Sequence, residues 1–402
     1  MPLLSQKTAL ESLTLPPVVR RPWRFRKFPI IAWWGPPGTA KPDDFRAYRD
    51  AGFNLYAANP DTGYEQAMEK AAHAGLSIMP YRQPQGFELP PHPADYSRHR
   101  DRIVGWITND EPSGDAGVTA AITAVNTLMR EDPTRWALFN MLPPGAQQNP
   151  STEPVISAAV RGGLPVLSYD SYVIHNDGTD ATEAHFRNLN QFRKASLRYD
   201  VPFWMFALSI QHFSYRRPSE SDLRWQQYTN LAYGAKGIWY FTYWGPTDWP
   251  DWDKIAIVDP RNGAPTDNYG YIQTLNRQIA AMGDLLLGLF CREVMHTIPP
   301  PGQDPFTPHR QWIGEITAAD ALIGFFNDNE GKQYALVVNK QHGKNKSARE
   351  TTDEIELRFA PTVRGVTAVN WLDGKAGPLK LQGQSATLTV AGGTGVLLRL
   401  DR

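Results

Sequence analysis

Two adjacent carboxylic acids, Asp110 and Glu111, end the run Gly105-Trp106-Ile107-Thr108-Asn109-Asp110-Glu111-Pro112. Cleavage of a glycosidic bond needs a proton donor for the leaving oxygen and a second carboxylate, acting as nucleophile or as base for water. Poor solvation beside Trp106 and the like charge of Asp110 are expected to raise the pKa of Glu111, which suits a donor. The same acids could instead cap a helix that opens at Pro112-Ser113. We favour a catalytic Glu111 because a cap needs only one of the two residues.

The elements that must position these acids follow a repeating pattern. Short apolar, β-rich runs alternate with stretches of helical periodicity from residue 28 to about 290, which is typical of βα units with a parallel sheet. The eight expected strands are Phe28–Trp34, Asn54–Ala58, Leu76–Tyr81, Ile103–Thr108, Arg135–Met141, Pro165–Tyr169, Pro202–Leu208 and Gly237–Tyr243. Eight such units predict an α/β fold, a (β/α)8 TIM barrel, over residues 28–290. Residues 1–27 are expected to form an irregular lead-in segment.

The pattern changes after residue 290. Six short alternating segments, separated by turns rich in Gly, Asn and Asp, extend from Ala321–Phe326 to Gly395–Leu400. Segments of this kind predict antiparallel pairing. We therefore expect a small antiparallel β-sandwich domain at residues 291–402, following the barrel.

The ends of the barrel strands select the further candidates, because the active site of such a barrel lies at the C-terminal ends of its strands. The candidates for binding a substrate are Trp34, Asn59, Tyr81, Arg82, Asn140, Tyr172, Gln211 and Trp244. The aromatic members would stack on a sugar ring, and the polar members would bind hydroxyls or an acidic substituent. Arg82, Asn59, Asn140, Trp34, Tyr81 and Tyr172 could each equally be structural.

Three segments resemble clan A glycoside hydrolases, with the family 42 β-galactosidases and family 5 as the nearest likeness. They are the Gly-Trp-x-x-x-Asp-Glu-Pro motif, Asp170-Ser171-Tyr172 and Gly234–Trp244, and the resemblance spans about residues 28–290. It implies that Glu111 is the acid/base residue and that Trp244 stacks on the sugar next to the scissile bond. Asp110 stands where these enzymes usually carry Asn, and their strand-seven nucleophile Glu is absent.

The second carboxylate is therefore an open question. Gln211 lies near the position where these enzymes carry the nucleophilic Glu, but its amide can neither attack an anomeric carbon nor ionise. Asp170 is the obvious substitute, although it could instead orient Tyr172 or Arg82. We expect a glycoside hydrolase acting on an oligo- or polysaccharide, with Glu111 as donor and Asp110 tuning it. The alternative is a carbohydrate-binding barrel without catalysis, which the absent nucleophile favours.

Composition excludes several other classes of protein. Lys+Arg and Asp+Glu both number 41, so the chain has no net charge and nucleic acid is not an expected partner. No apolar run reaches the length of a membrane span, and the single Cys291 excludes an internal disulfide. No phosphate, dinucleotide or metal motif is present, so neither cofactor nor metal is expected. Oligomeric state and location stay open: periplasmic or secreted if a signal sequence was trimmed, otherwise cytoplasmic.

Overall fold

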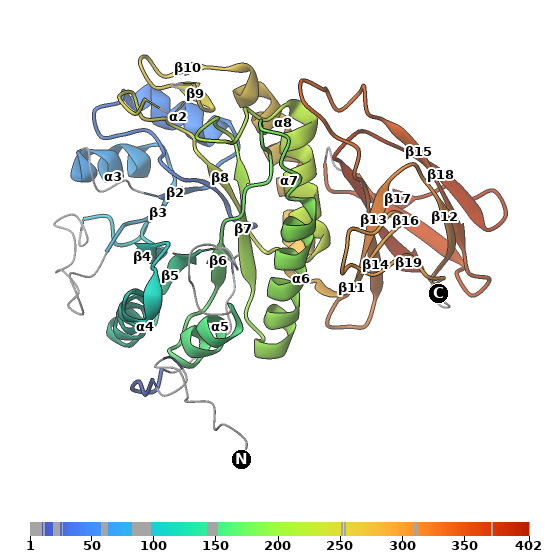
Figure 1. The fold of residues 1–402 in the computed structure, drawn as a ribbon, viewed down its shortest axis with the longest axis horizontal. Coiled ribbons are helices and arrows are strands. Elements are labelled where there is room, and N and C mark those ends of the chain that lie inside the picture. Colours follow the sequence, from blue (N-terminus) through green and yellow to red (C-terminus); the bar gives the residue numbers. More distant parts are fainter. Residues whose placement is uncertain are drawn as a thin grey trace.

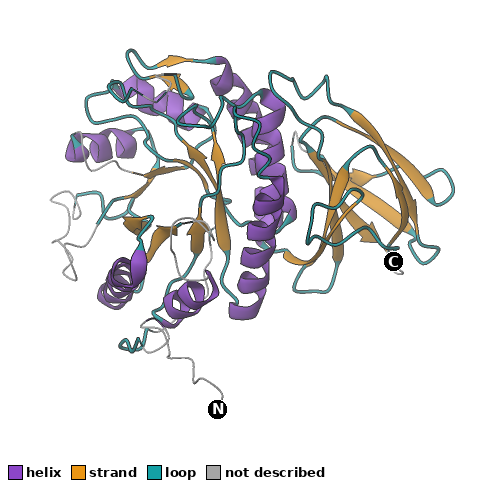
Figure 2. Cartoon of the chain, in the orientation of Figure 1, coloured by secondary structure: helices purple, strands orange, loops and turns teal. Residues whose placement is uncertain are grey.

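The computed structural model shows an α/β barrel beside a domain made of β-strands (Figure 1). It describes residues 10, 13–18, 25, 27–57, 63–82, 98–142, 152–250, 252, 255–308, 312–370 and 373–401. In Figure 2 the helices surround the barrel strands, and the second domain contains strands and loops. This arrangement confirms the predicted barrel followed by a β-sandwich.

The barrel strands occupy the predicted runs. They are β1 (Ile30–Ala32), β2 (Leu55–Ala57), β3 (Ser77–Met79), β4 (Gly105–Asp110), β5 (Trp136–Met141), β6 (Leu167–Tyr169), β7 (Phe203–Leu208) and β8 (Ile238–Phe241). All neighbouring strands are parallel, in the order β3-β2-β1-β8-β7-β6-β5-β4. The sheet closes between β3 and β4 through single bridges, Ile78 to Ile103 and Tyr81 to Ile107.

The helices around the barrel also fall where the periodicity predicts them. They are α2 (Pro42–Asp50), α3 (Tyr64–His73), α4 (Gly114–Glu131), α5 (Thr152–Arg161), α6 (Thr182–Tyr199), α7 (Glu220–Ala232) and α8 (Asp267–Leu287). Ser219 caps α7, because its side chain accepts from the Asp222 N–H while the Asp222 side chain accepts from the Ser219 N–H. A short hairpin of β9 (Val258–Asp259) and β10 (Ala264–Pro265) lies between β8 and α8.

Aromatic side chains fill the inside of the barrel. The ring of Trp239 lies 5.5 Å from that of Trp33, 5.9 Å from that of Trp204 and 5.0 Å from that of Phe206. These large rings exclude water from the barrel axis, so this part is a packed core and not a pore. Ligands are therefore confined to the two ends of the barrel.

The second domain consists of two antiparallel sheets. Its strands are β11 (Phe290–His296), β12 (Ile313–Thr317), β13 (Ala321–Asn327), β14 (Gln333–Asn339), β15 (Asp353–Phe359), β16 (Gly365–Val369), β17 (Ala376–Pro378), β18 (Ser385–Val390) and β19 (Gly395–Asp401). One sheet has the order β11-β13-β14-β19-β16-β17, and the other β12-β15-β18. A separate apolar core, including Ile323, Val337 and Leu357, lies between the sheets.

Helix α7 joins the two domains, and Figure 1 shows it between the barrel and the sandwich. Every residue from Ser221 to Ala232 is buried, so α7 is covered on all sides. The backbone of the sandwich approaches it closely: a Cβ atom at Gly324 would lie 2.1 Å from the Ala232 carbonyl oxygen. A single apolar core accordingly runs from the barrel into the sandwich residues Leu336 and Leu397.

The described part of the lead-in segment lies against the N-terminal end of the barrel. Phe25 packs its ring against Trp136 and Trp204, with centroids 5.2 and 5.6 Å apart. The Pro16 carbonyl accepts a hydrogen bond of 2.9 Å from Asn126 on α4. These contacts close the end of the barrel that faces away from the strand C-termini.

Candidate active site

A β-bulge at the end of β4 decides which acid faces the barrel mouth. Ile107 pairs with Leu138, but Asp110 pairs with Asn140, so β4 advances three residues while β5 advances two. In a regular strand the side chain of Asn109 would lie on the same face of the sheet as Ile107. The extra residue in the bulge puts the side chain of Asp110 on that face instead. Bulges of this kind re-aim side chains beside active sites. Asp110 thereby enters the same row as Asn140 and Ser168.

Asn140 links two of the candidate carboxylates. Its Nδ2 donates to Asp170 Oδ1 at 2.7 Å and to Asp110 Oδ1 at 3.2 Å, and its Oδ1 accepts from Ser168 Oγ at 3.0 Å. Because both donated bonds start from one nitrogen, the two carboxylate oxygens are at most 5.9 Å apart. Asn140 and Asp170 are 3% and 6% exposed. The amide therefore fixes the two acids inside the barrel mouth.

The acids shift one another's protonation. Burial, followed by the charges of Glu111 and Asp110, raises the pKa of Asp170 well above its usual range, and a hydrogen bond with Glu111 adds to the rise. Part of the Asp110 side chain is exposed. Its pKa is nevertheless raised to about 7, first because the surrounding protein displaces water from its carboxyl group and then because of the Glu111 charge. The Asn140 amide opposes both shifts. Asp170 and Asp110 therefore release their protons at a higher pH than isolated carboxyl groups do.

Glu111 lies immediately after β4 and is exposed. Its backbone is left-handed with φ of 45°, and its N–H donates to the Asn140 carbonyl oxygen at 3.0 Å. A left-handed conformation at a residue other than glycine costs about 1–3 kcal/mol and is found where function requires a side-chain direction. The three acids named from the sequence thus meet at the C-terminal ends of β4 and β6. Glu111 is the exposed partner of buried Asp170.

Aromatic rings continue this cluster across the barrel mouth. Charges on Asp170, Asp110 and Glu111 act, after burial, to raise the pKa of Tyr172. The Tyr172 ring lies 5.5 Å from Phe241 on β8, which lies 5.6 Å from Trp34. Sugars bind to such combinations of flat apolar faces and hydrogen-bonding groups.

Trp244 lies away from the acids, on the other side of Trp34. Together with Trp34 and Trp249 it lines a cavity of about 620 Å³ formed by the loops after β1 and β8 and by the turn of the β9–β10 hairpin. Phe241, three residues earlier, is the β8 aromatic that contacts Tyr172 beside the acids. Stacking by Trp244 next to the scissile bond, which the resemblance implies, stays a prediction.

The remaining candidates differ in their surroundings. Arg82 is buried and forms an ion pair of 3.0 Å with Glu131 on α4, and its guanidinium lies over the Trp106 ring. The Tyr81 ring packs edge-on against Trp33. Gln211 is exposed after β7. Asn59 lies outside the described residues.

Three residues beside the acids were not among the candidates from the sequence: Ser168, Tyr215 and Phe241. Ser168 lies two positions before Asp170 on the same strand face, so the period of a β-strand could have indicated it. Phe241 lies one strand period after Trp239, which faces the barrel interior, so the same period could have indicated it. Tyr215, whose pKa is raised by burial and then by the charges of Asp170 and Glu111, lies in a loop and carries no sequence signal.

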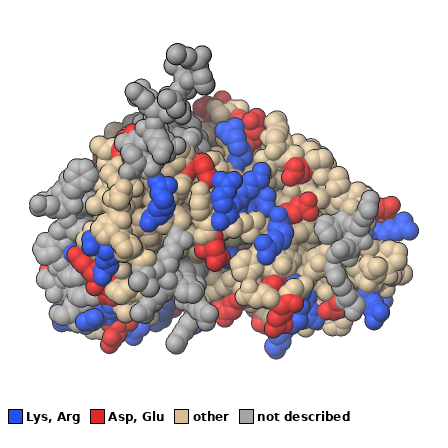
Figure 3. All heavy atoms as spheres, turned by 90° about the horizontal axis from the view of Figure 1, so that it is seen from below, with Lys and Arg blue, Asp and Glu red and all other residues tan. Residues whose placement is uncertain are grey.

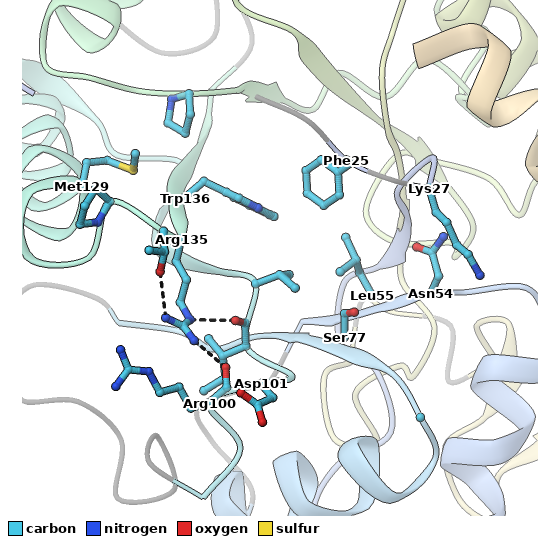
Figure 4. A pocket seen from close by; sticks show the side chains of 16 residues that line it. Phe25, Lys27, Asn54, Leu55, Ser77, Arg100, Asp101, Met129, Arg135 and Trp136 are labelled. Atoms are coloured by element: carbon cyan, nitrogen blue, oxygen red, sulfur yellow. Dashed lines mark hydrogen bonds between the residues drawn. The ribbon is translucent and has the colours of Figure 1, made fainter. Parts of the chain in front are cut away.

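A larger cavity of about 920 Å³ lies at the opposite end of the barrel (Figure 4). Phe25, Leu55, Ser77 and Trp136 line it, together with Arg135. The Arg135 side chain is used internally, donating to the Ile103 and Arg100 carbonyl oxygens. The N-terminal end of such barrels serves stability, so the chemistry is assigned to the other end despite the smaller cavity there.

Neither a family model nor a characterised protein matches the chain by sequence. Solved structures do match. A β-galactosidase from Bacillus circulans sp. alkalophilus aligns with a TM-score of 0.57 at 10% identity, over 94% of this chain and 99% of that chain. A β-galactosidase from Rahnella sp. R3 gives 0.50 at 10% identity, over 96% and 100%. A family 39 glycoside hydrolase from the gut symbiont Bacteroides cellulosilyticus WH2 gives 0.50 at 13%, over 94% and 81%.

These identities are low, so the likeness shows the fold alone. The chain shares its fold, a (β/α)8 barrel followed by a β-sandwich domain, with these solved structures. Among the described residues, no group of three or more His, Cys, Asp or Glu side chains is arranged to hold a metal ion. In the same part of the chain, no helix is both long and apolar enough to cross a membrane.

Surface charge on one face is mixed. Figure 3 shows Lys and Arg side chains interspersed with Asp and Glu side chains among uncharged residues. The whole chain likewise contains 41 Lys and Arg residues and 41 Asp and Glu residues.

Proposed function

We propose that this protein is a glycoside hydrolase acting on an oligo- or polysaccharide, with Glu111 as the proton donor. The observation that carries the proposal is the convergence of three carboxyl groups around Asn140 at the C-terminal mouth of a glycoside hydrolase-type barrel. Glu111 is exposed and can reach a leaving oxygen, whereas Asp170 is buried and its pKa is raised. Their shared hydrogen bond would let Asp170 supply the proton that Glu111 donates.

The second catalytic carboxylate must be ionised and accessible. Asp170 suits this role less well, because it is 6% exposed and burial raises its pKa well above the usual range. Asp110 is exposed, and its pKa of about 7 leaves it partly ionised. We therefore propose Asp110 as the base or nucleophile and Asp170 as the residue that tunes and recharges Glu111.

Substrates of the structural neighbours suggest where to begin. Two of them are β-galactosidases, so p-nitrophenyl β-galactoside and β-linked galacto-oligosaccharides are the first substrates to test. Placement in family 42 or family 5 belongs to this proposal as well.

The test replaces the donor by its uncharged isostere. We expect Glu111→Gln to lower kcat by about 10²- to 10⁴-fold, because general acid catalysis contributes that factor. Glu315→Gln, on the exposed face of β12, is the matched control and should keep full activity. Equal turnover by Glu111→Gln and the wild type would refute the donor assignment.

A carbohydrate-binding barrel without catalysis is the second candidate, because β7 is followed by Gln211 and not by a carboxylate. This hypothesis predicts that calorimetry detects saccharide binding while no reducing sugar is released from any substrate. It also predicts that Glu111→Gln binds the saccharide as tightly as the wild type.

A further inference from the structure

The cavity on the far side of Trp34 has the size and walls of a small-ligand site. Its volume is about 620 Å³, within the range of known ligand pockets. Trp249, which lines it, is one of the few large apolar side chains among the described residues that stay exposed, with 43% of its surface accessible. The ring of Trp249 meets that of Trp34 edge-on, with centroids 5.4 Å apart. An aromatic face is thus open beside the barrel mouth.

A series of aromatic contacts leads from this cavity to the carboxylate cluster. The centroid of the Tyr172 ring, beside the acids, lies 5.5 Å from that of Phe241, and the centroid of Phe241 lies 5.6 Å from that of Trp34. Trp34 both contacts Phe241 and lines the cavity. A sugar in the cavity would lie two rings away from the acids, so it would not be the residue whose bond is cleaved.

The polar wall of the cavity is fixed before any ligand binds. Arg261, in the β9–β10 turn, donates through Nε to Asp259 Oδ1 at 2.8 Å and through Nη2 to Oδ2. The Asp259 carboxylate uses only part of the five N–H donors of the guanidinium. The remaining donors can bind hydroxyl groups without a further loss of side-chain freedom.

The charges that line the cavity balance. Lys41 and Arg261 are positive and Asp44 and Asp248 are negative, so the lining side chains carry no net charge, and Asp259, which pairs with Arg261, adds one negative charge next to them. An anionic sugar would gain no net attraction here and would lose its hydration. The site therefore suits an uncharged ring whose C–H face packs on tryptophan and whose hydroxyls contact charged side chains.

We infer that this cavity is a second sugar-binding subsite that holds an uncharged pyranose unit of an oligosaccharide bound across the barrel mouth. The inference rests on the proposed carbohydrate function. It makes Trp249 a residue that selects longer substrates, while the carboxylate cluster acts on the bond between other units.

The test measures binding by calorimetry with the Glu111→Gln variant, which keeps the ligand intact. The probes are cellotetraose, laminaritetraose, β-1,4-galactotetraose and tetragalacturonate. We expect at least one neutral tetrasaccharide to bind and tetragalacturonate not to bind. Adding Trp249→Ala should weaken that tetrasaccharide by about ten-fold, or 1.4 kcal/mol, and leave the matching methyl monoglycoside unchanged. Trp249→Phe should restore most of the affinity.

Tyr271→Ala, which removes an exposed aromatic ring from α8, is the control and should bind like its parent. The subsite is refuted if no neutral tetrasaccharide binds, if tetragalacturonate binds best, or if Trp249→Ala has no effect. Hydrolysis by the wild type is measured separately. Binding that depends on Trp249 without hydrolysis would support the subsite and reject the hydrolase, whereas hydrolysis with a Trp249→Ala variant of unchanged KM would do the reverse.

Discussion

Replacing Asn140 by Ala removes the amide that joins Asp110 and Asp170. Both acids lose a hydrogen-bond donor that opposes the rise of their pKa values, and Ser168 loses its acceptor. We expect two consequences, a loss of stability and a change in how activity depends on pH. The two can be measured independently.

The size of the stability loss follows from the contacts. Hydrogen bonds to charged groups contribute about 1.5–3 kcal/mol each and neutral ones about 1 kcal/mol. Counted at the lower value for each of the three bonds, the loss is about 3 kcal/mol of free energy of unfolding. For 402 residues the entropy of unfolding is roughly 0.8 kcal/mol/K, so a single transition would shift down by about 4 °C.

Activity should change in a direction that stability alone does not produce. Without the amide, the pKa values of Asp110 and Asp170 rise further, so each limb of the kcat/KM–pH profile that these groups control moves to higher pH. Asn276→Ala is the matched control, since buried Asn276 also makes two hydrogen bonds, both of 2.9 Å, but far from the acids. An unchanged profile for Asn140→Ala, or an equal shift for Asn276→Ala, would refute the proposed role of the amide.

Two further predictions concern stability and pH. The raised pKa of Asp170 means that the folded state binds its proton more tightly than the unfolded state, so the associated stability is lost as pH rises above about 4. Asp170→Asn should therefore raise the melting temperature relative to wild type at pH 8 more than at pH 5, while hydrolysis is lost; an equal gain at both values would contradict this. Burial favours a higher pKa for Asp222, but hydrogen bonds from His342 and Arg216 hold it well below the usual range. Its stabilisation is present above about pH 4 and lost as pH falls further, so Asp222→Asn should cost about 3 kcal/mol at pH 7, and this deficit should begin to shrink only below pH 4 in thermal unfolding. A loss of stability that does not change with pH would contradict the proposed pairing of Asp222, on α7, with Arg216 and with His342 of the sandwich.

Much of the fold could be predicted because local patterns agree with tertiary burial. Helix α6 begins and ends at the predicted residues, and each barrel strand lies within one or two residues of its predicted run. The buried strands of a parallel barrel are continuous apolar runs, which are easily recognised. Three sandwich strands, β11, β12 and β17, were not predicted; β12 has only five residues, one of which is buried, and β17 is only Ala376–Pro378.

The sequence also indicated where the acids lie, but not which of them is buried and which is exposed. Position at the ends of the fourth and sixth strands is enough to bring Asp110, Glu111 and Asp170 to one rim. Which of them is buried depends on the bulge after Ile107 and on the row shared with Asn140. These are register effects between strands, and they have no local signature.

Interdomain contacts show the same limit. The basic turn around His342 looks like a solvated loop in the sequence, yet its imidazole stacks on Trp225 and bonds to Asp222 of α7. Only the docking of the sandwich on α7 creates that contact.

Periodicity and strand-end chemistry by themselves determined the barrel, the sandwich and the acidic rim, because each is set by residues close in sequence. Tertiary structure decided that Asp170 is buried, that Asp110 faces inward and that Phe241 contacts Tyr172. Burial and register depend on which distant strands lie side by side, so the protonation and roles of the acids follow from the fold and not from the chain alone.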